Sequence, residues 1–158
     1  KKTYKNFKDI NLNNFLKFLN SIVLFIVSCI SLIGCAPPEP QLELKLENQP
    51  VEQVFSFADY CEEKYDSILL LSPYVNTEIE DFVNLKMSET LRIWCESNTD
   101  FDTFSTLLFI SNGKVEAFSE VMRIDADFVK IANDCPQFFS FRQKFILDKD
   151  RNVHLYSE

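Results

Sequence analysis

From about Val51 onward, the hydrophobic positions of the chain mix helical and strand periods. Pro50 suits a first helical position. After it, apolar residues recur at three- and four-residue spacing up to about Lys64. The expected inward face of this first helix consists of Val51, Val54, Phe55, Ala58, Cys61 and Tyr65. The run Ile68–Leu71 is short and is stopped by Pro73, which is typical of a strand buried on both faces.

The middle of the chain continues this alternation of periods. Asn76 or Thr77 can cap a second helix. Beyond that helix, Leu91, Ile93 and Cys95 alternate with Arg92, Trp94 and Glu96, as a half-buried strand over these positions requires.

The remainder of the chain carries antiparallel signals. Asn112-Gly113 suits the positive φ angles of a type I′ turn, so the segments beside it are expected to pair as a hairpin. Asp125 can cap a short helix, and a polar turn at 148–151 joins a last pair of strands. The expected elements are strands 106–111 and 114–124, a helix over 125–133, and strands 138–147 and 152–156.

These periods predict an α+β fold. Residues 51–158 are expected to form a single small domain with a mainly antiparallel sheet and helices packed on one face. This length suits one hydrophobic core, and the sequence contains no internal repeat that would indicate a second domain.

A lysine-rich leader and an apolar run come before this domain. Five lysines precede the run 18–34, which falls short of the ~20 apolar residues that cross a bilayer comfortably. The run ends at Leu32-Ile33-Gly34-Cys35, which resembles the lipobox of bacterial lipoprotein signal peptides. An uncleaved transmembrane anchor is the alternative interpretation of this segment.

The resemblance implies a lipid anchor and a location. Residues 1–34 would be a signal peptide that is removed, and Cys35 would become the first residue of the mature protein, linked to diacylglycerol and usually acylated on its amine. Two or three acyl chains give stable membrane anchoring. In this family, Ala36 in place of Asp is typical of sorting to the outer membrane, where the domain would face the periplasm or the cell surface.

Residues 35–50 are expected to be the lipidated cysteine and a flexible tether. Three prolines within 37–40 prevent a helix and favour an extended chain. Leu42, Leu44 and Leu46 alternate with polar residues, so the same segment also has the pattern of a short edge strand.

Removal of the leader makes the protein strongly acidic. The leader holds five of the sixteen basic residues and one of the twenty-four acidic residues, which leaves a net charge of −12. Such a charge disfavours nucleic acid and favours cationic protein partners, although a merely solvated surface has the same composition. Gly113 is the only glycine after the leader, so we do not expect the glycine-rich loops of nucleotide sites.

Candidate catalytic residues are few. His154 is the only histidine, which excludes sites that need two, and its place in the last strand predicts an outward position. Ser72 follows the buried strand at its carboxyl end, where open α/β sheets place their sites. Glu96, Asp100 and Asp102 lack the ligand spacing of a calcium-binding EF-hand loop. We expect neither a metal nor a cofactor.

One aromatic group is a candidate binding patch. Alternation places Trp94 opposite Ile93 and Cys95, and Phe101 and Phe104 follow closely in the sequence. The alternative is that helices cover this face and bury the three aromatic side chains.

The cysteines suggest one covalent link. With Cys35 taken by lipid, Cys61, Cys95 and Cys135 would face an oxidising compartment, and three thiols allow one bridge. Cys61 in the first helix and Cys135 at a helix end can reach the ~5.5–6 Å Cα separation that a disulfide prefers. We expect a Cys61–Cys135 disulfide and a buried free thiol at Cys95.

Two functional classes fit these observations. The first is a membrane-anchored, non-enzymatic envelope lipoprotein whose acidic domain binds another envelope protein, as an assembly part, an exclusion factor or an immunity factor against a cationic toxin. The second is a small surface hydrolase that uses carboxylates or a serine near Ser72. The single histidine and the lack of catalytic motif spacing favour the first class.

Replacing Cys35 with serine is expected to abolish lipid attachment, because lipid transfer requires the thiol nucleophile. Metabolic labelling with a fatty-acid analogue and membrane fractionation measure this loss against the wild type. Equal labelling of wild type and Cys35→Ser would contradict the lipobox interpretation.

Overall fold

A computed structural model describes residues 37–62, 64–78, 80–132 and 136–157 of the chain. The predicted signal peptide over 1–34, the predicted lipidation site Cys35, and Cys135 lie outside the described residues. Within the described ranges, no helix is long and apolar enough to cross a membrane.

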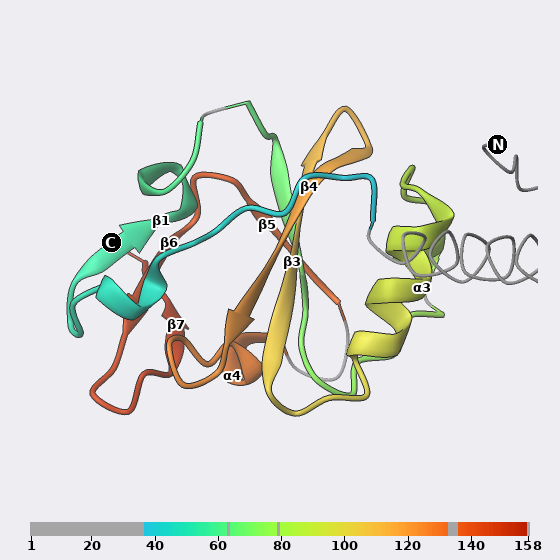
Figure 1. Ribbon diagram of the computed structural model, residues 1–158. Coiled ribbons are helices and arrows are strands. Elements are labelled where there is room, and N and C mark those ends of the chain that lie inside the picture. The colour runs from blue at the N-terminus through green and yellow to red at the C-terminus, as the bar shows by residue number, and fades with distance from the viewer. Residues whose placement is uncertain (1–36, 63, 79, 133–135, 158) are drawn as a thin grey trace, which may run out of the picture. The chain divides into compact units, whose positions relative to one another are not determined.

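Four antiparallel strands form the larger sheet, in the order β4-β3-β2-β5 (Figure 1). They are β2 (Ser67–Leu71), β3 (Phe104–Ser111), β4 (Lys114–Met122) and β5 (Gln137–Ser140). In β2, Ile68 and Leu70 face one core while Leu69 and Leu71 face another, and each is at most 1% exposed. The prediction of a strand buried on both faces is therefore confirmed.

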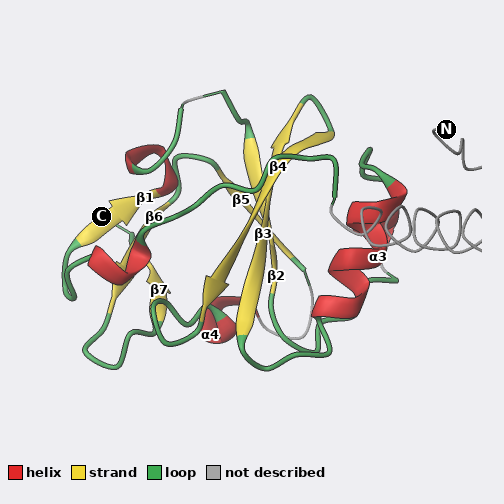
Figure 2. Cartoon of the chain, viewed as in Figure 1, coloured by secondary structure: helices red, strands yellow, loops and turns green. Residues whose placement is uncertain are grey.

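Two helices cover one face of this sheet, of which the longer, α3, is prominent in Figure 2. They are α2 (Glu80–Val83) and α3 (Glu89–Asn98). Phe82 of α2 and Leu91 and Cys95 of α3 are fully buried against the apolar side chains of β2, β3 and β4. A helix was expected at α2, although the observed one is a single turn.

The prediction of a strand over 91–96 is wrong, because this segment belongs to α3. Ser88 caps the helix, since its hydroxyl accepts a hydrogen bond from the Leu91 N–H at 3.1 Å. Leu91 and Cys95 are four residues apart and face inward, whereas Ile93 is exposed. Leu91 and Cys95 fit both periods, whereas Ile93 fits only the strand, and the Ser88 cap favours the helix.

A second sheet covers the opposite face of the larger sheet. Its strands, in the order β1-β6-β7, are β1 (Val54–Ser56), β6 (Lys144–Leu147) and β7 (Val153–Leu155). Phe57 lies in the core between the two sheets, where its ring stacks on Phe128 with centroids 6.1 Å apart. It also meets Phe109 and Phe145 edge-on, at 6.1 and 5.3 Å.

The prediction of a first helix over 51–64 is wrong. This segment contains β1, which pairs with β6, and then a 3-10 helix, Phe57–Asp59. Phe55 and Phe57, which are two residues apart, are both buried, whereas Val54, which precedes Phe55, is exposed. The period of two selects the inward face here, and the helical spacing is coincidental.

The hairpin predicted at Asn112-Gly113 joins β3 to β4. Both turn residues have positive φ, 51° and 71°, as a type I′ turn requires. A β-bulge leaves Glu116 as an extra residue in β4 and shifts the pairing by one position. Phe104 therefore lies opposite Met122, whereas a regular hairpin would place it opposite Val121.

The end of the chain contains the predicted last hairpin, formed by β6 and β7. The single strand expected over 138–147 is divided, because β5 joins the larger sheet and β6 the smaller one. The helix expected over 125–133 is shorter in the described residues, where α4 spans Val129–Ala132. Leu155 is exposed, although it lies two residues after the buried Val153 in β7.

Residues 37–50, called the strap below, pack along the domain. The Leu42 N–H donates to the Phe118 carbonyl at 2.7 Å, which adds a short parallel bridge to the edge of β4. Leu46 is fully buried, and Leu42 and Leu44 pack against the core between the sheets. The structure differs here from the expected flexible tether, because these leucines pack against the core between the sheets.

The fold is thus a small, mainly antiparallel α+β domain with few helices, as predicted. The larger sheet has helices on one face. The division of the strands into two sheets was not predicted.

Truncating Leu46 to alanine is expected to destabilise the protein by about 2–4 kcal/mol, because a fully buried side chain would be replaced by a cavity. Leu155→Ala is the matched control, with an expected change within about 0.5 kcal/mol at an exposed site. Urea unfolding followed by the fluorescence of Trp94, the only tryptophan, measures both. Equal destabilisation by the two variants would show that the strap does not belong to the cooperative fold.

Candidate functional site

The predicted aromatic patch is partly assembled by the fold. Phe101 follows the end of α3 and Phe104 begins β3, and their rings stack with centroids 6.5 Å apart and an interplanar angle of 26°. Phe101 is 55% exposed. Met122, opposite Phe104 on β4, is 47% exposed and enlarges the apolar surface.

Trp94 lies on α3 rather than on a strand, so its position differs from the one predicted. It is half-buried and packs against the core under the helices. Its indole N–H donates a hydrogen bond to Glu120 Oε1 at 3.0 Å. Glu120 precedes Met122 by two residues and therefore shares its face of β4. Trp94, Phe101, Phe104 and Met122 are called the aromatic face below.

Glu120 is the polar centre of this region. Besides Trp94, Asn98 donates to Glu120 Oε1 at 2.8 Å, and Gln41 of the strap donates to Oε2 at 3.3 Å. The carboxylate therefore joins α3, β4 and the strap. All three donors to this carboxylate are uncharged side chains.

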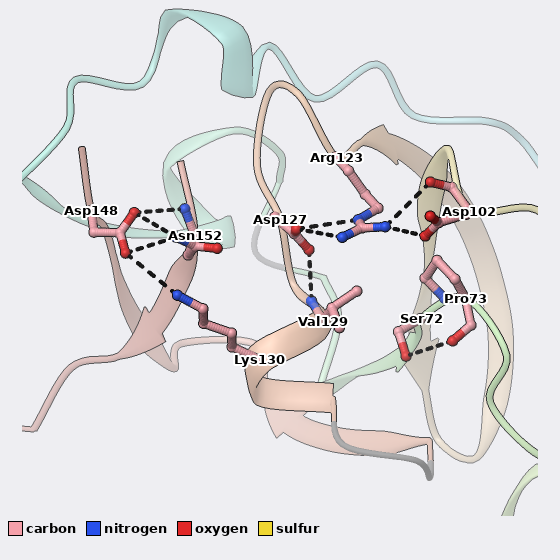
Figure 3. A network of polar contacts seen from close by, with 9 residues as sticks. All are labelled: Ser72, Pro73, Asp102, Arg123, Asp127, Val129, Lys130, Asp148 and Asn152. Carbon is pink, nitrogen blue, oxygen red and sulfur yellow. Dashed lines mark hydrogen bonds and ion pairs between the residues drawn. The ribbon is translucent and has the colours of Figure 1, made fainter. Parts of the chain in front are cut away.

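Acidic residues surround the aromatic face. Asp100 and Asp102 flank Phe101 in the sequence and are exposed, whereas Glu96 is exposed on the side of α3 away from Trp94 and Asn98. Arg123 is the neighbouring cation, but two carboxylates share it, as Figure 3 shows. The rim of the aromatic face is therefore negative.

Arg123 links the loop before β3 to the loop before α4. Its guanidinium donates to Asp127 Oδ2 at 3.2 and 2.8 Å and also pairs with Asp102. Asp127 in turn accepts the Val129 N–H at 3.0 Å and so caps α4. This network joins the loop before β3, which also contains Phe101, to the loop before α4 (Figure 3).

A second polar cluster surrounds Asp148 in the β6–β7 turn. Its carboxylate accepts bonds from the backbone and side chain of Asn152, at 2.8 to 3.0 Å, and from the backbone of Asp150. His154 lies 2.9 Å from Asp148 Oδ2, and Lys130 lies 4.0 Å away. The bond with His154, together with those from Asn152 and Asp150, holds the pKa of Asp148 well below its usual range.

The two side chains considered for a hydrolase, Ser72 and His154, have different hydrogen-bond partners. Ser72 is buried, and its hydroxyl donates to the Pro73 carbonyl at 3.5 Å. His154 is partly exposed on β7, as predicted, and contacts Asp148. No group of three or more His, Cys, Asp or Glu side chains in the described part of the chain is arranged to hold a metal ion.

The described cysteines are not bridged to each other. Cys95 is buried as expected, and its burial raises the pKa of the thiol to about 12. Cys61 is half-buried, and its thiol donates to the Phe57 carbonyl at 3.4 Å. Because Cys135 lies outside the described residues, the Cys61–Cys135 disulfide stays a prediction.

Sequence reasoning did not identify Met122, Glu120 or Arg123 as parts of this region. The hairpin turn alone would have turned Met122 to the other face, because the bulge is not visible in the sequence pattern. The chain matches no protein family model, no curated protein and no solved structure.

Replacing Asp148 with asparagine is expected to destabilise the protein at neutral pH. The folded-state pKa of Asp148 is lowered, so its charged form contributes stability above the unfolded value of about 3.9, and this contribution is lost as the pH falls below that value. The difference in unfolding free energy between wild type and Asp148→Asn should therefore shrink below about pH 4.

The matched control is Asp150→Asn, because Asp150 joins the same turn through its backbone N–H. Denaturant unfolding at a series of pH values measures both variants. A gap for Asp148→Asn that is constant through the acid range would contradict the assigned role of the carboxylate charge.

Proposed function

We propose that this protein is a lipid-anchored protein of the bacterial envelope whose acidic domain binds a cationic protein through the aromatic face. Lipid on Cys35 would hold it at the membrane, and the outer membrane is the location that Ala36 favours. The proposed role is binding, as an assembly part, an exclusion factor or an immunity factor.

The stacking of the exposed Phe101 on the half-buried Phe104 is the observation that carries this proposal. An aromatic side chain that is more than half exposed, next to an exposed Met122, leaves apolar area that the domain itself does not cover. Aromatic residues and methionine are enriched in protein interfaces, where aromatic anchors supply much of the binding energy.

The charge of the rim favours one kind of partner. Asp100 and Asp102 flank Phe101 and are exposed, while Arg123 is shared by two carboxylates. A partner with apolar residues bordered by lysine or arginine would satisfy both features, and the net charge of −12 would steer its approach. An acidic partner or nucleic acid would meet repulsion at the same surface.

Photo-crosslinking tests the proposed surface. A photoreactive phenylalanine analogue at Phe101 is expected to give one crosslinked basic protein in intact cells. The same analogue at Phe138, which is exposed on β5 at the other edge of the sheet, is the matched control and should not give it.

The captured protein, once purified, is expected to bind Phe101→Ala about tenfold more weakly than wild type, because truncation of an aromatic anchor costs more than ~1 kcal/mol. Its association rate should fall as salt rises. Equal affinity for Phe101→Ala and Phe138→Ala, or an acidic captured protein, would overturn the proposal.

A further inference from the structure

We propose that the strap orients the anchored domain, with the tip of the β3–β4 hairpin toward the membrane and the aromatic face directed away from it. This inference rests on the proposed lipid anchor at Cys35. It adds to that function the side from which the partner must approach.

The first support is the tight attachment of the strap close to Cys35. The carboxylate of Glu39 accepts hydrogen bonds from the Ser88 N–H at 2.7 Å and from the Ser88 hydroxyl at 2.6 Å. Burial alone would raise the pKa of Glu39, but these bonds and the charge of Lys114 lower it overall. Glu39 is therefore charged at neutral pH and is held at the start of α3.

The direction of the strap gives the second support. The Phe118 N–H donates to the Pro40 carbonyl at 3.1 Å, and the bridge between Gln41 and Phe118 is parallel. Going back from Gln41, the strap therefore runs toward the start of β4, that is, toward the hairpin tip. A cavity of about 360 Å³ lies on this path, lined by Pro38, Glu39, Pro40, Lys114, Val115 and Glu116.

The length of chain before this attachment is the third support. Three residues lie between Cys35 and Glu39, so the two are four residue steps apart. A fully extended chain covers at most ~3.3–3.6 Å per residue, so the lipidated cysteine would lie within about 14 Å of Glu39. This reach is short compared with the size of the domain. It therefore limits the rotation of an anchored domain relative to the membrane surface.

The aromatic face lies at the other end of the same elements. β4 runs from Lys114 at the hairpin tip to Met122 in the aromatic face, which corresponds to about 26 Å of strand. α3 begins at Ser88, beside Glu39, and leads after about 15 Å to Phe101. Figure 1 shows the hairpin tip and the loop from α3 into β3 at opposite ends of the long strands.

This arrangement restricts the partner of the aromatic face. The partner would have to approach from the aqueous compartment, or extend more than about 20 Å from the bilayer surface. A partner fully embedded in the same membrane would not reach Phe101.

Energy transfer to the bilayer tests the orientation. A fluorescent amino acid is placed at Lys114 or at Phe101 of the full, acylated protein, which is reconstituted into vesicles of phosphatidylethanolamine and phosphatidylglycerol that contain an acceptor-labelled lipid. Transfer from position 114 is expected to exceed transfer from position 101 about twofold or more, because Lys114 lies at the hairpin tip and Phe101 belongs to the aromatic face, about 26 Å of strand away.

A flexible Gly-Ser insertion between Ala36 and Pro37 is the matched control. It leaves the domain unchanged but lengthens the anchor, so the two positions should then give similar transfer. Equal transfer without the insertion, or greater transfer from position 101, in vesicle-bound protein would overturn the orientation and leave the anchor intact. Acylated protein that does not bind the vesicles would overturn the anchor and the orientation together.

Discussion

The burial of β2 on both faces is the constraint on which the rest of the structure depends. Its four apolar residues, Ile68 to Leu71, alternate between two cores, so both faces of the larger sheet need cover. α2 and α3 cover one face, and the smaller sheet with Phe57 covers the other. The chain therefore forms two hydrophobic cores, one on each face of the larger sheet.

The strap connects these two cores. Leu46 is buried in the core between the sheets, while Glu39 binds the start of α3 on the opposite face. Arg151 fixes the far end of the strap, since its guanidinium donates to the Gln49 carbonyl at 2.8 Å and to the Leu46 carbonyl. A segment with the composition of a linker thus contributes to packing, and the same contacts support the proposed placement of the aromatic face.

Two segments were predicted with the wrong period, for the same reason. In the segments 51–64 and 91–96, a few apolar residues fit both a helix and a strand. The partner decided each case: β6 supplies backbone hydrogen bonds that make Val54–Ser56 a strand, and the Ser88 cap with the inward pair Leu91 and Cys95 makes the other segment a helix. Short periodic segments take their conformation from the surface against which they pack.

The sequence by itself determined the strand at β2, the type I′ hairpin and the α+β class, because each depends on local backbone preference or on a long apolar pattern. It also identified Phe101 and Phe104 as a candidate surface. Only the tertiary structure decided that Met122 joins them, because the bulge at Glu116 shifts the register by one residue and so reverses the faces of β4 beyond it. The extra residue of a bulge leaves no mark in the hydrophobic pattern, and its consequence appears only when the two strands pair.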